Sequence, residues 1–179
     1  MIKRWFRRPD PARLRVLMVC MGNICRSPMA EAVLRTRLAS AGLAQAVVVD
    51  SAGTHGFHKG ALPDPRAVAQ AAARGYSLEG LKSRPVVAAD FTAFDLLLAM
   101  DHDNLDTLRE RCPVPEHGRL ALLLPFAKVA GAGLATDEVP DPYFGSVAGF
   151  DLALDLIEPA CDGLLADLQR RLAQLPPPI

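Results

Sequence analysis

The sequence has few of the features that mark membrane or nucleic-acid-binding proteins. None of its apolar runs approaches the roughly 20 residues that cross a bilayer, so we expect no stable membrane insertion. Its 20 Lys and Arg residues balance its 20 Asp and Glu residues, which gives a formal net charge of zero. This balance gives no electrostatic reason to expect nucleic acid or an acidic membrane as a partner.

Cysteine and histidine are also scarce, with four of each. The cysteines are Cys20, Cys25, Cys112 and Cys161, and the histidines are His55, His58, His102 and His117. Cysteines without a regular framework fit a reducing cytoplasm better than a disulfide scaffold. The histidines have no zinc-ligand spacing relative to the cysteines, so we expect neither a metal nor another cofactor.

The amino-terminal segment is basic and could be mistaken for a secretory signal. The apolar run that follows it is only about as long as a strand, and Val19 is not the small residue that a cleavage site needs. The length of 179 residues fits one domain. We predict a basic tail over residues 1–13, a single domain over residues 14–175 and a cytoplasmic location.

Apolar segments of strand length alternate with helical patterns along the chain. The predicted strands are 15–21, 46–51, 94–100 and 120–125. The predicted helices are 28–41, 63–75, 103–111 and 146–175, with a helical turn at 86–91 and a loop at 130–140. Such alternation is typical of βαβ units, whose crossovers are right-handed. The prediction is a three-layer α/β fold, with a four-stranded parallel sheet and helices on both faces.

The most informative segment follows the first predicted strand and reads Cys20-Met21-Gly22-Asn23-Ile24-Cys25-Arg26-Ser27-Pro28. A strand, a short loop and a helix start bring backbone N–H groups together at a helix amino terminus, which suits a phosphate. Five residues separate Cys20 from Arg26, so the loop can wrap a tetrahedral dianion between a thiolate and a guanidinium. The positive surroundings would favour the thiolate of Cys20. A buried strand cysteine before an ordinary loop is the alternative, and it leaves Gly22 and Asn23 unexplained.

Two polar residues of this loop have more than one possible role. Ser27 can donate to the thiolate, cap the following helix, or do both. Asn23 can adopt a left-handed backbone, or its side chain can brace the loop, for example against Ser51.

The nine-residue segment closely resembles the signature of the low-molecular-weight protein tyrosine phosphatases of the bacterial type. The resemblance extends over about residues 14–172 and includes Asp50-Ser51-Ala52-Gly53-Thr54, Pro65-Arg66-Ala67, Met100-Asp101 and Asn104-Leu105. It implies hydrolysis of protein phosphotyrosine through a phosphocysteine at Cys20. Arg26 and the amides of the phosphate-binding loop, Met21, Gly22, Asn23, Ile24, Cys25 and Ser27, would bind the phosphoryl oxygens.

Residues 139–145, Val-Pro-Asp-Pro-Tyr-Phe-Gly, resemble the acid-bearing loop of that family. The resemblance implies that Asp141 protonates the leaving phenolate and later activates water. Taken alone, an aspartate before a proline is common at turns. Tyr143, Phe144 and Phe57 match positions of the substrate cleft, although each is also compatible with ordinary core packing.

The sequence departs from the family pattern in a few places. Leu81 stands where a histidine braces the loop asparagine, which removes one brace. Phe57 replaces a tryptophan or tyrosine, and Phe144 replaces a second tyrosine.

Cys25 lies five residues after Cys20. If the loop curls as expected, the two sulfurs come close enough for a reversible disulfide that protects Cys20 from further oxidation. The alternative for Cys25 is a small buried residue.

Three rival functions fit the same loop less well. Thioredoxin-coupled arsenate reductases need a further close pair of cysteines, whereas Cys112 has no near partner. Protein-arginine phosphatases tend to carry threonine where this chain has Ile24. A non-catalytic phosphotyrosine-binding module would be expected to lose Cys20, Arg26 or Asp141. The expected partners are therefore phosphotyrosine proteins, and resemblance to bacterial members suggests a cognate tyrosine kinase among them.

Overall fold

The computed structural model describes residues 12–128, 131 and 135–176. The predicted basic tail lies outside these residues, except for its last two positions, and part of the predicted loop 130–140 lies outside them as well. The boundary of the single domain at 14–175 stays a prediction.

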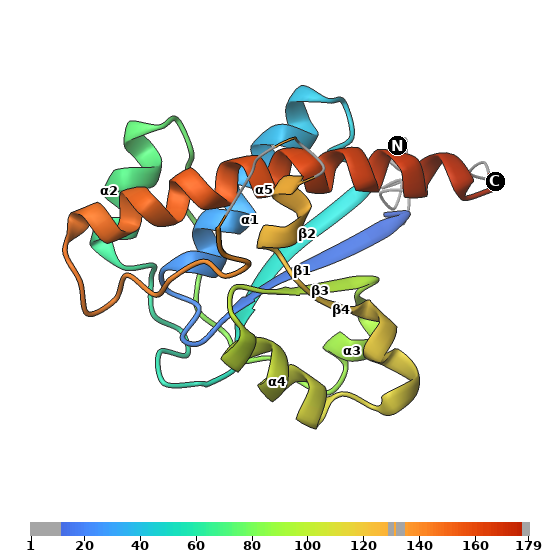
Figure 1. Cartoon of the computed structure of the whole chain (residues 1–179), viewed down its shortest axis with the longest axis horizontal. Helices are drawn as coiled ribbons and strands as arrows, with labels where there is room; N and C mark the ends of the chain where they lie inside the picture. The colour runs from blue at the N-terminus through green and yellow to red at the C-terminus, as the bar shows by residue number, and fades with distance from the viewer. Residues whose placement is uncertain (1–11, 129–130, 132–134, 177–179) are drawn as a thin grey trace, which may run out of the picture.

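The fold is built on one four-stranded sheet (Figure 1). Its strands are β1 (Leu14–Cys20), β2 (Val47–Gly53), β3 (Leu96–Ala99) and β4 (Leu120–Leu122). Their order is β2-β1-β3-β4 and every pair is parallel. The central strands are apolar almost throughout because a parallel sheet is covered on both faces. The predicted parallel α/β sheet is confirmed.

Helices cover both faces of the sheet, so the molecule has three layers (Figure 1). The helices are α1 (Arg26–Ser40), α2 (Pro65–Ala73), α3 (Asp90–Ala93), α4 (His102–Arg111) and α5 (Val147–Gln174). Val16 and Met18 of β1 pack with α1, α2 and α5, whereas Leu17 and Val19 pack with α3 and α4. The two apolar cores therefore follow the alternation of side chains along β1.

The element boundaries correct several of the predictions. The helical turn expected at 86–91 lies at Asp90–Ala93. The last strand ends at Leu122 and is followed by a 3-10 helix, η2 (Leu124–Lys128), because Pro125 has no N–H to continue the ladder. A second 3-10 helix, η1 (Val114–Arg119), was not predicted. The helix predicted at 63–75 spans Pro65–Ala73, because the side chain of Asp64 caps its start.

Among the described residues, no helix is both long and apolar enough to cross a membrane.

Candidate active site

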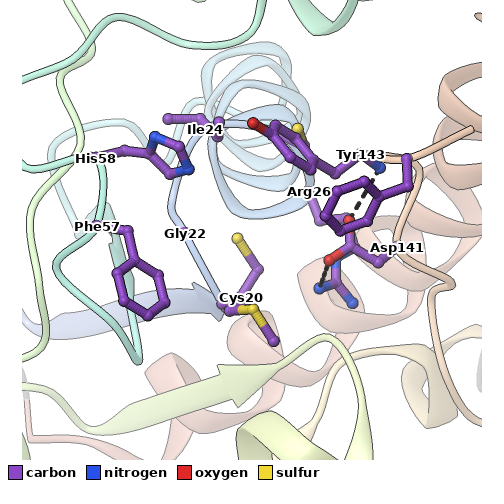
Figure 2. Close-up of a pocket in the computed structure, with 11 residues that line it drawn as sticks. Cys20, Gly22, Ile24, Arg26, Phe57, His58, Asp141 and Tyr143 are labelled. Carbon is purple, nitrogen blue, oxygen red and sulfur yellow. Dashed lines mark hydrogen bonds and ion pairs between the residues drawn. The ribbon is translucent and has the colours of Figure 1, made fainter.

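The segment from Cys20 to Ser27, called here the Cys20 loop, connects the carboxyl end of β1 to α1. Ligands of open parallel sheets bind at this edge. The Cys20 side chain is buried at the base of a pocket (Figure 2). The backbone N–H of Asn23 donates to Cys20 Sγ over 3.3 Å, and Ser27 Oγ lies 3.0 Å from the same sulfur. Donors directed at sulfur stabilise a thiolate.

Ser27 contacts the sulfur rather than capping the helix. It lies within the first turn of α1, whose start has no side-chain cap, so the predicted capping role is wrong. Ser27 Oγ accepts a hydrogen bond of 2.9 Å from Asn23 Nδ2. Its own proton can therefore point at the sulfur of Cys20, which is nearer than the alternative acceptor, the Ala52 carbonyl at 3.4 Å.

Asn23 combines both of its predicted features. Its φ of 54° places it in the left-handed region. Its Nδ2 also donates to Ser51 Oγ over 2.9 Å, and its Oδ1 accepts from the backbone N–H of Arg84 over 2.9 Å. The side chain is therefore bonded on both sides, which fixes the curl of the loop.

Behind Asn23, a buried carboxylate completes the bracing network. Ser51 Oγ donates to Glu31 Oε2 over 2.5 Å, and Arg35 forms an ion pair with the other carboxylate oxygen. Burial raises the pKa of Glu31, although the Ser51 hydrogen bond and the Arg35 charge oppose the shift. Leu81, the predicted departure, packs against the apolar core. Sequence reasoning missed Glu31, although a glutamate four residues after Ser27 in an apolar helix start indicates a shared buried face.

The end of β2 supports the Cys20 loop by direct backbone contact. The N–H of Thr54 donates to Cys20 O over 2.9 Å, and the N–H of His55 donates to Met21 O over 3.0 Å. A Cβ at Gly53 would lie 2.6 Å from Met21 O, so only glycine permits this approach.

Arg26 lies at the end of the loop and is almost completely buried, with 1% of its surface exposed. Its Nη1 donates to Asp101 Oδ2 over 2.5 Å and to the Val139 carbonyl over 3.1 Å. Its Nη2 donates to Asp141 Oδ2 over 2.8 Å. The guanidinium is therefore oriented by groups from two other segments of the chain.

The surroundings of Arg26 stabilise its charged form. Burial alone would lower its pKa, but the negative charges of Cys20 and the two carboxylates outweigh burial and raise the pKa above the usual value. Asp101 is itself fixed as the cap of α4, where it accepts from the N–H of Asn104 over 2.7 Å. No role for Asp101 followed from the sequence. Its position between a buried strand and a helix start is the signal that was available.

Asp141 lies in the segment 139–145, called here the Asp141 loop, which leads into α5. Its Oδ2 faces Arg26, and its Oδ1 accepts from the N–H of Tyr143 over 3.1 Å (Figure 2). The Asp141 side chain is 41% exposed. The structure thus brings Cys20, Arg26 and Asp141, predicted from distant parts of the sequence, to one pocket.

The pocket has a volume of about 210 Å³ and mainly apolar walls. It is lined by Cys20, Met21, Gly22, Ile24, Cys25, Arg26, Phe57, His58, Asp141, Tyr143 and Phe144. Phe57 and Phe144 are 74% and 96% exposed, so the alternative of core packing is wrong for both. The rings of Tyr143 and Phe144 meet edge to face, with centroids 4.9 Å apart.

His58 was not predicted to line this pocket. A Cβ at Gly22 would lie 2.9 Å from its ring, so the imidazole covers the Cys20 loop directly. Its ring centroid lies 5.9 Å from that of Tyr143, across the pocket from it (Figure 2).

The four cysteines are free thiols. Cys25 lines the pocket together with Cys20 and is buried. Burial and the carboxylate of Asp64 raise the pKa of Cys25 to about 12, so its thiol is protonated at neutral pH. In the part of the chain that the structure describes, no group of three His, Cys, Asp or Glu side chains is arranged to hold a metal ion.

Comparison with known proteins places this chain in a family. The model of the low molecular weight phosphotyrosine protein phosphatases matches residues 15–174. A low molecular weight protein-tyrosine-phosphatase of Streptomyces coelicolor is 44% identical over 157 residues, which cover 88% of this chain and 94% of that protein. A putative one from Synechocystis is 40% identical over 160 residues, covering 89% and 99%.

Solved structures of other proteins are similar to this chain in both fold and sequence. A protein tyrosine phosphatase from Entamoeba histolytica, with Hepes in its active site, superposes with a TM-score of 0.84 at 39% identity and covers 89% of this chain and 99% of its own. A Drosophila arginine phosphatase superposes with a TM-score of 0.77 at 31% identity, covering 87% and 98%. This chain therefore belongs to the low molecular weight phosphotyrosine protein phosphatase family of hydrolases.

Proposed function

We propose that this protein hydrolyses phosphotyrosine in other proteins through a phosphocysteine intermediate. The observation that carries the proposal is the meeting of Cys20, Arg26 and Asp141 in one apolar-walled pocket. Cys20 is the nucleophile, and Arg26 with the amides of the Cys20 loop binds the phosphoryl group. Asp141 is the acid in the first step and the base in the second.

In the first step, the Cys20 thiolate attacks phosphorus and the bond from phosphorus to the phenolic oxygen breaks. Asp141, in its protonated form, gives its proton to that oxygen. Arg26 and the loop amides hold the equatorial oxygens, on which charge is concentrated in the transition state. The hydrogen bonds from Ser27 and Asn23 stabilise the thiolate before attack.

In the second step, water attacks the phosphocysteine while the Asp141 carboxylate accepts its proton. The bond from sulfur to phosphorus breaks, which releases inorganic phosphate and restores the thiolate. The same donors stabilise the sulfur as it leaves, so one set of residues serves both steps.

The depth of the pocket supports an aryl substrate. Cys20 is only 3% exposed, whereas the aromatic side chains of Phe57 and Phe144 stand at the rim. Phosphoserine and phosphothreonine have shorter side chains without a ring. With their phosphate at Cys20, no aromatic ring of the substrate would contact the aromatic side chains at the rim. Phosphotyrosine spans this depth and presents a ring to apolar walls.

Protein-arginine phosphatase is the second candidate, since the Drosophila structure of that description is similar to this chain. Ile24 lines the pocket as an apolar, branched residue, which suits an aryl ring better than a guanidinium. Arsenate reduction through a cysteine relay has less support, because Cys112 and Cys161 are not among the residues that line the pocket.

The deciding experiment compares kcat/KM on peptides that carry phosphotyrosine, phosphoserine or phosphoarginine at one position, with arsenate reduction measured in parallel. We expect phosphotyrosine to be preferred and Cys20→Ser to lose turnover by about 10⁴-fold or more. A preference for phosphoarginine, or turnover that survives Cys20→Ser, would refute the proposal.

We also propose that Cys25 protects Cys20 under oxidation. Peroxide would oxidise the Cys20 thiolate to a sulfenic acid, and Cys25 would then attack that sulfur, forming a disulfide and releasing water. After mild peroxide, mass spectrometry should find Cys20 linked to Cys25 in the wild type, and Cys20 sulfinic acid in Cys25→Ser. Sulfinic acid without a linkage in the wild type would contradict this role.

The proposed partners are tyrosine-phosphorylated proteins, a cognate kinase among them. The proposed location is the cytoplasm, which the four free thiols support.

A further inference from the structure

We infer that Arg66 is a positioning residue that fixes the Asp141 loop relative to the Cys20 loop. Arg66 is the second residue of α2, far from Asp141 in sequence, and Figure 1 shows α2 beside the amino-terminal part of α5. The inference rests on the proposed role of Asp141 as general acid.

Arg66 holds the Asp141 loop by its backbone. Its Nη2 donates to the Tyr143 carbonyl over 3.0 Å, and its Nη1 donates to the Gly145 carbonyl over 3.1 Å. The first part of the loop is held by Arg26 and by the Met100 carbonyl, which accepts from the N–H of Val139. Among the described residues after Asp141, the other hydrogen bonds of the loop are local, such as those from Tyr143 N to Asp141 and from Gly145 N to Pro142. Arg66 thus ties the segment that follows Asp141 to a different part of the fold.

The other edge of the same guanidinium is tied to the Cys20 loop through Asp64. Arg66 Nε and Nη2 donate to the two oxygens of Asp64, over 3.0 and 2.8 Å. Asp64 is anchored in turn, because its backbone N–H donates to the Ile24 carbonyl over 2.8 Å. The hydrogen bonds from Arg66 lower the pKa of Asp64, so this carboxylate stays ionised. A continuous chain of bonds therefore connects Ile24 in one loop to Tyr143 in the other.

The plane of the guanidinium is fixed by Phe150, a fully buried residue near the start of α5. Arg66 Cζ lies 4.7 Å from the centroid of that ring. Stacking on an aromatic face while donating along two edges requires a planar fork, which lysine lacks. The arrangement explains why an arginine stands at this position.

Displacing an acid by about 1 Å can slow a reaction by about 10²-fold. Loss of Arg66 should therefore weaken proton transfer from Asp141 while leaving the phosphate site intact. The loss should be greatest for leaving groups that most need a proton. A merely structural role would slow all substrates equally.

Arg74 provides a matched control. It follows α2 and binds Asp151, Asp155 and Glu158 of α5, so it also connects these two helices. None of these contacts involves the Asp141 loop. Arg74→Met should destabilise the protein without changing the dependence on the leaving group.

The test measures kcat/KM on aryl phosphates whose phenols become progressively less acidic, for Arg66→Met, Arg74→Met, Asp141→Asn and the double variant Arg66→Met/Asp141→Asn. For the least acidic phenol, Arg66→Met should lose about 10- to 100-fold, with a smaller loss for the most acidic one. In the Asp141→Asn background, Arg66→Met should lower kcat/KM by less than about twofold.

The affinity of Arg66→Met for vanadate should stay within about threefold of the wild type, because the Cys20 loop is retained. Arg66→Lys, which keeps the charge over Phe150, should show the same trend with a smaller loss, and it replaces Arg66→Met if that variant does not fold.

Equal losses for all phenols, or losses that multiply in the double variant, would overturn the role of Arg66 alone. An Asp141→Asn protein with wild-type kcat/KM would overturn both this inference and the general-acid proposal. The two failures are therefore distinguishable.

Discussion

The two loops of the site are built very differently. The Cys20 loop is buried except around Met21 and Gly22, and its backbone and side chains are bonded to β2, to Asp101 after β3 and to the segment around Arg84. The Asp141 loop is more exposed, with Phe144 almost wholly in solvent, and is held by Arg26, Arg66, one backbone bond from Val139 to Met100 and a few local bonds. Phosphate binding needs many donors fixed in advance, whereas an acid needs only one well-placed carboxyl group.

This contrast predicts that changes around the Cys20 loop alter stability and activity together. Changes in the Asp141 loop should alter activity with little effect on stability. Each of the following variants tests one side of the comparison.

Among the variants that compare the two loops, the largest effect is expected from Arg26→Lys. Lysine cannot reach Asp101, Asp141 and the Val139 carbonyl together, and it cannot grip two phosphoryl oxygens. We expect kcat/KM on phosphotyrosine peptides to fall by about 10²- to 10³-fold, with a lower melting temperature because Asp101 loses its buried partner. Arg37→Lys, on the same helix but paired with Asp162 at the surface, is the control. Near-wild-type turnover by Arg26→Lys would contradict the role of the guanidinium.

Gly53→Ala should have the next largest effect. The new Cβ would lie 2.6 Å from Met21 O and 3.2 Å from the N of Asn23, so the Cys20 loop must shift. We expect a loss of about 1–3 kcal/mol in the free energy of unfolding and a clear fall in turnover. Gly56→Ala, where the nearest atom outside its chain neighbours is a Pro85 side-chain carbon at 3.7 Å, should be close to neutral. If Gly53→Ala and Gly56→Ala have the same stability and turnover, the close approach of the Gly53 backbone does not determine the shape of the Cys20 loop.

Glu31→Gln should change the pH dependence of the free energy of unfolding. Burial raises the pKa of Glu31 in the folded protein, so the protonated form favours folding and this contribution is lost as pH rises through the folded value. The stability of Glu31→Gln relative to the wild type should therefore increase from acid to neutral pH. Urea unfolding at several pH values measures this, and a difference that is constant or falls with pH would contradict it.

The smallest effect on stability is expected from Phe144→Ala. The ring is 96% exposed and meets Tyr143 only by its edge. The free energy of unfolding should stay within about 0.5 kcal/mol of the wild type. KM for phosphotyrosine peptides should rise severalfold, with kcat little changed, because the rim contacts the substrate rather than the reacting atoms. A loss of stability as large as that of Gly53→Ala would remove the contrast between the loops.

The predictions from sequence succeeded where the signal was local. An apolar run predicted β1, and the predicted order of strand, loop and helix start around Cys20 is found in the structure. Boundaries were less well predicted where a cap or a proline decided them, as at Asp64 and Pro125. The capping role of Ser27 failed because α1 begins at Arg26, two residues before the predicted start at residue 28.

The residues that the sequence alone did not assign share one property: they act through partners far away in the chain. Asp101, Arg66 and Glu31 each bind an atom from another segment, and His58 lies over Gly22. Such contacts depend on how strands and helices are placed, which hydrophobic periodicity does not specify.

By itself, the sequence determined the parallel α/β fold and singled out Cys20, Arg26 and the segment around Asp141 as the candidate site, because each rests on residue type and short-range spacing. Only the tertiary structure decided what holds them together: Asp101 and Val139 around Arg26, Glu31 behind Ser51, and Arg66 between the two loops. The physical reason is that hydrogen bonds and ion pairs between distant segments form only once the sheet has brought its carboxyl ends together.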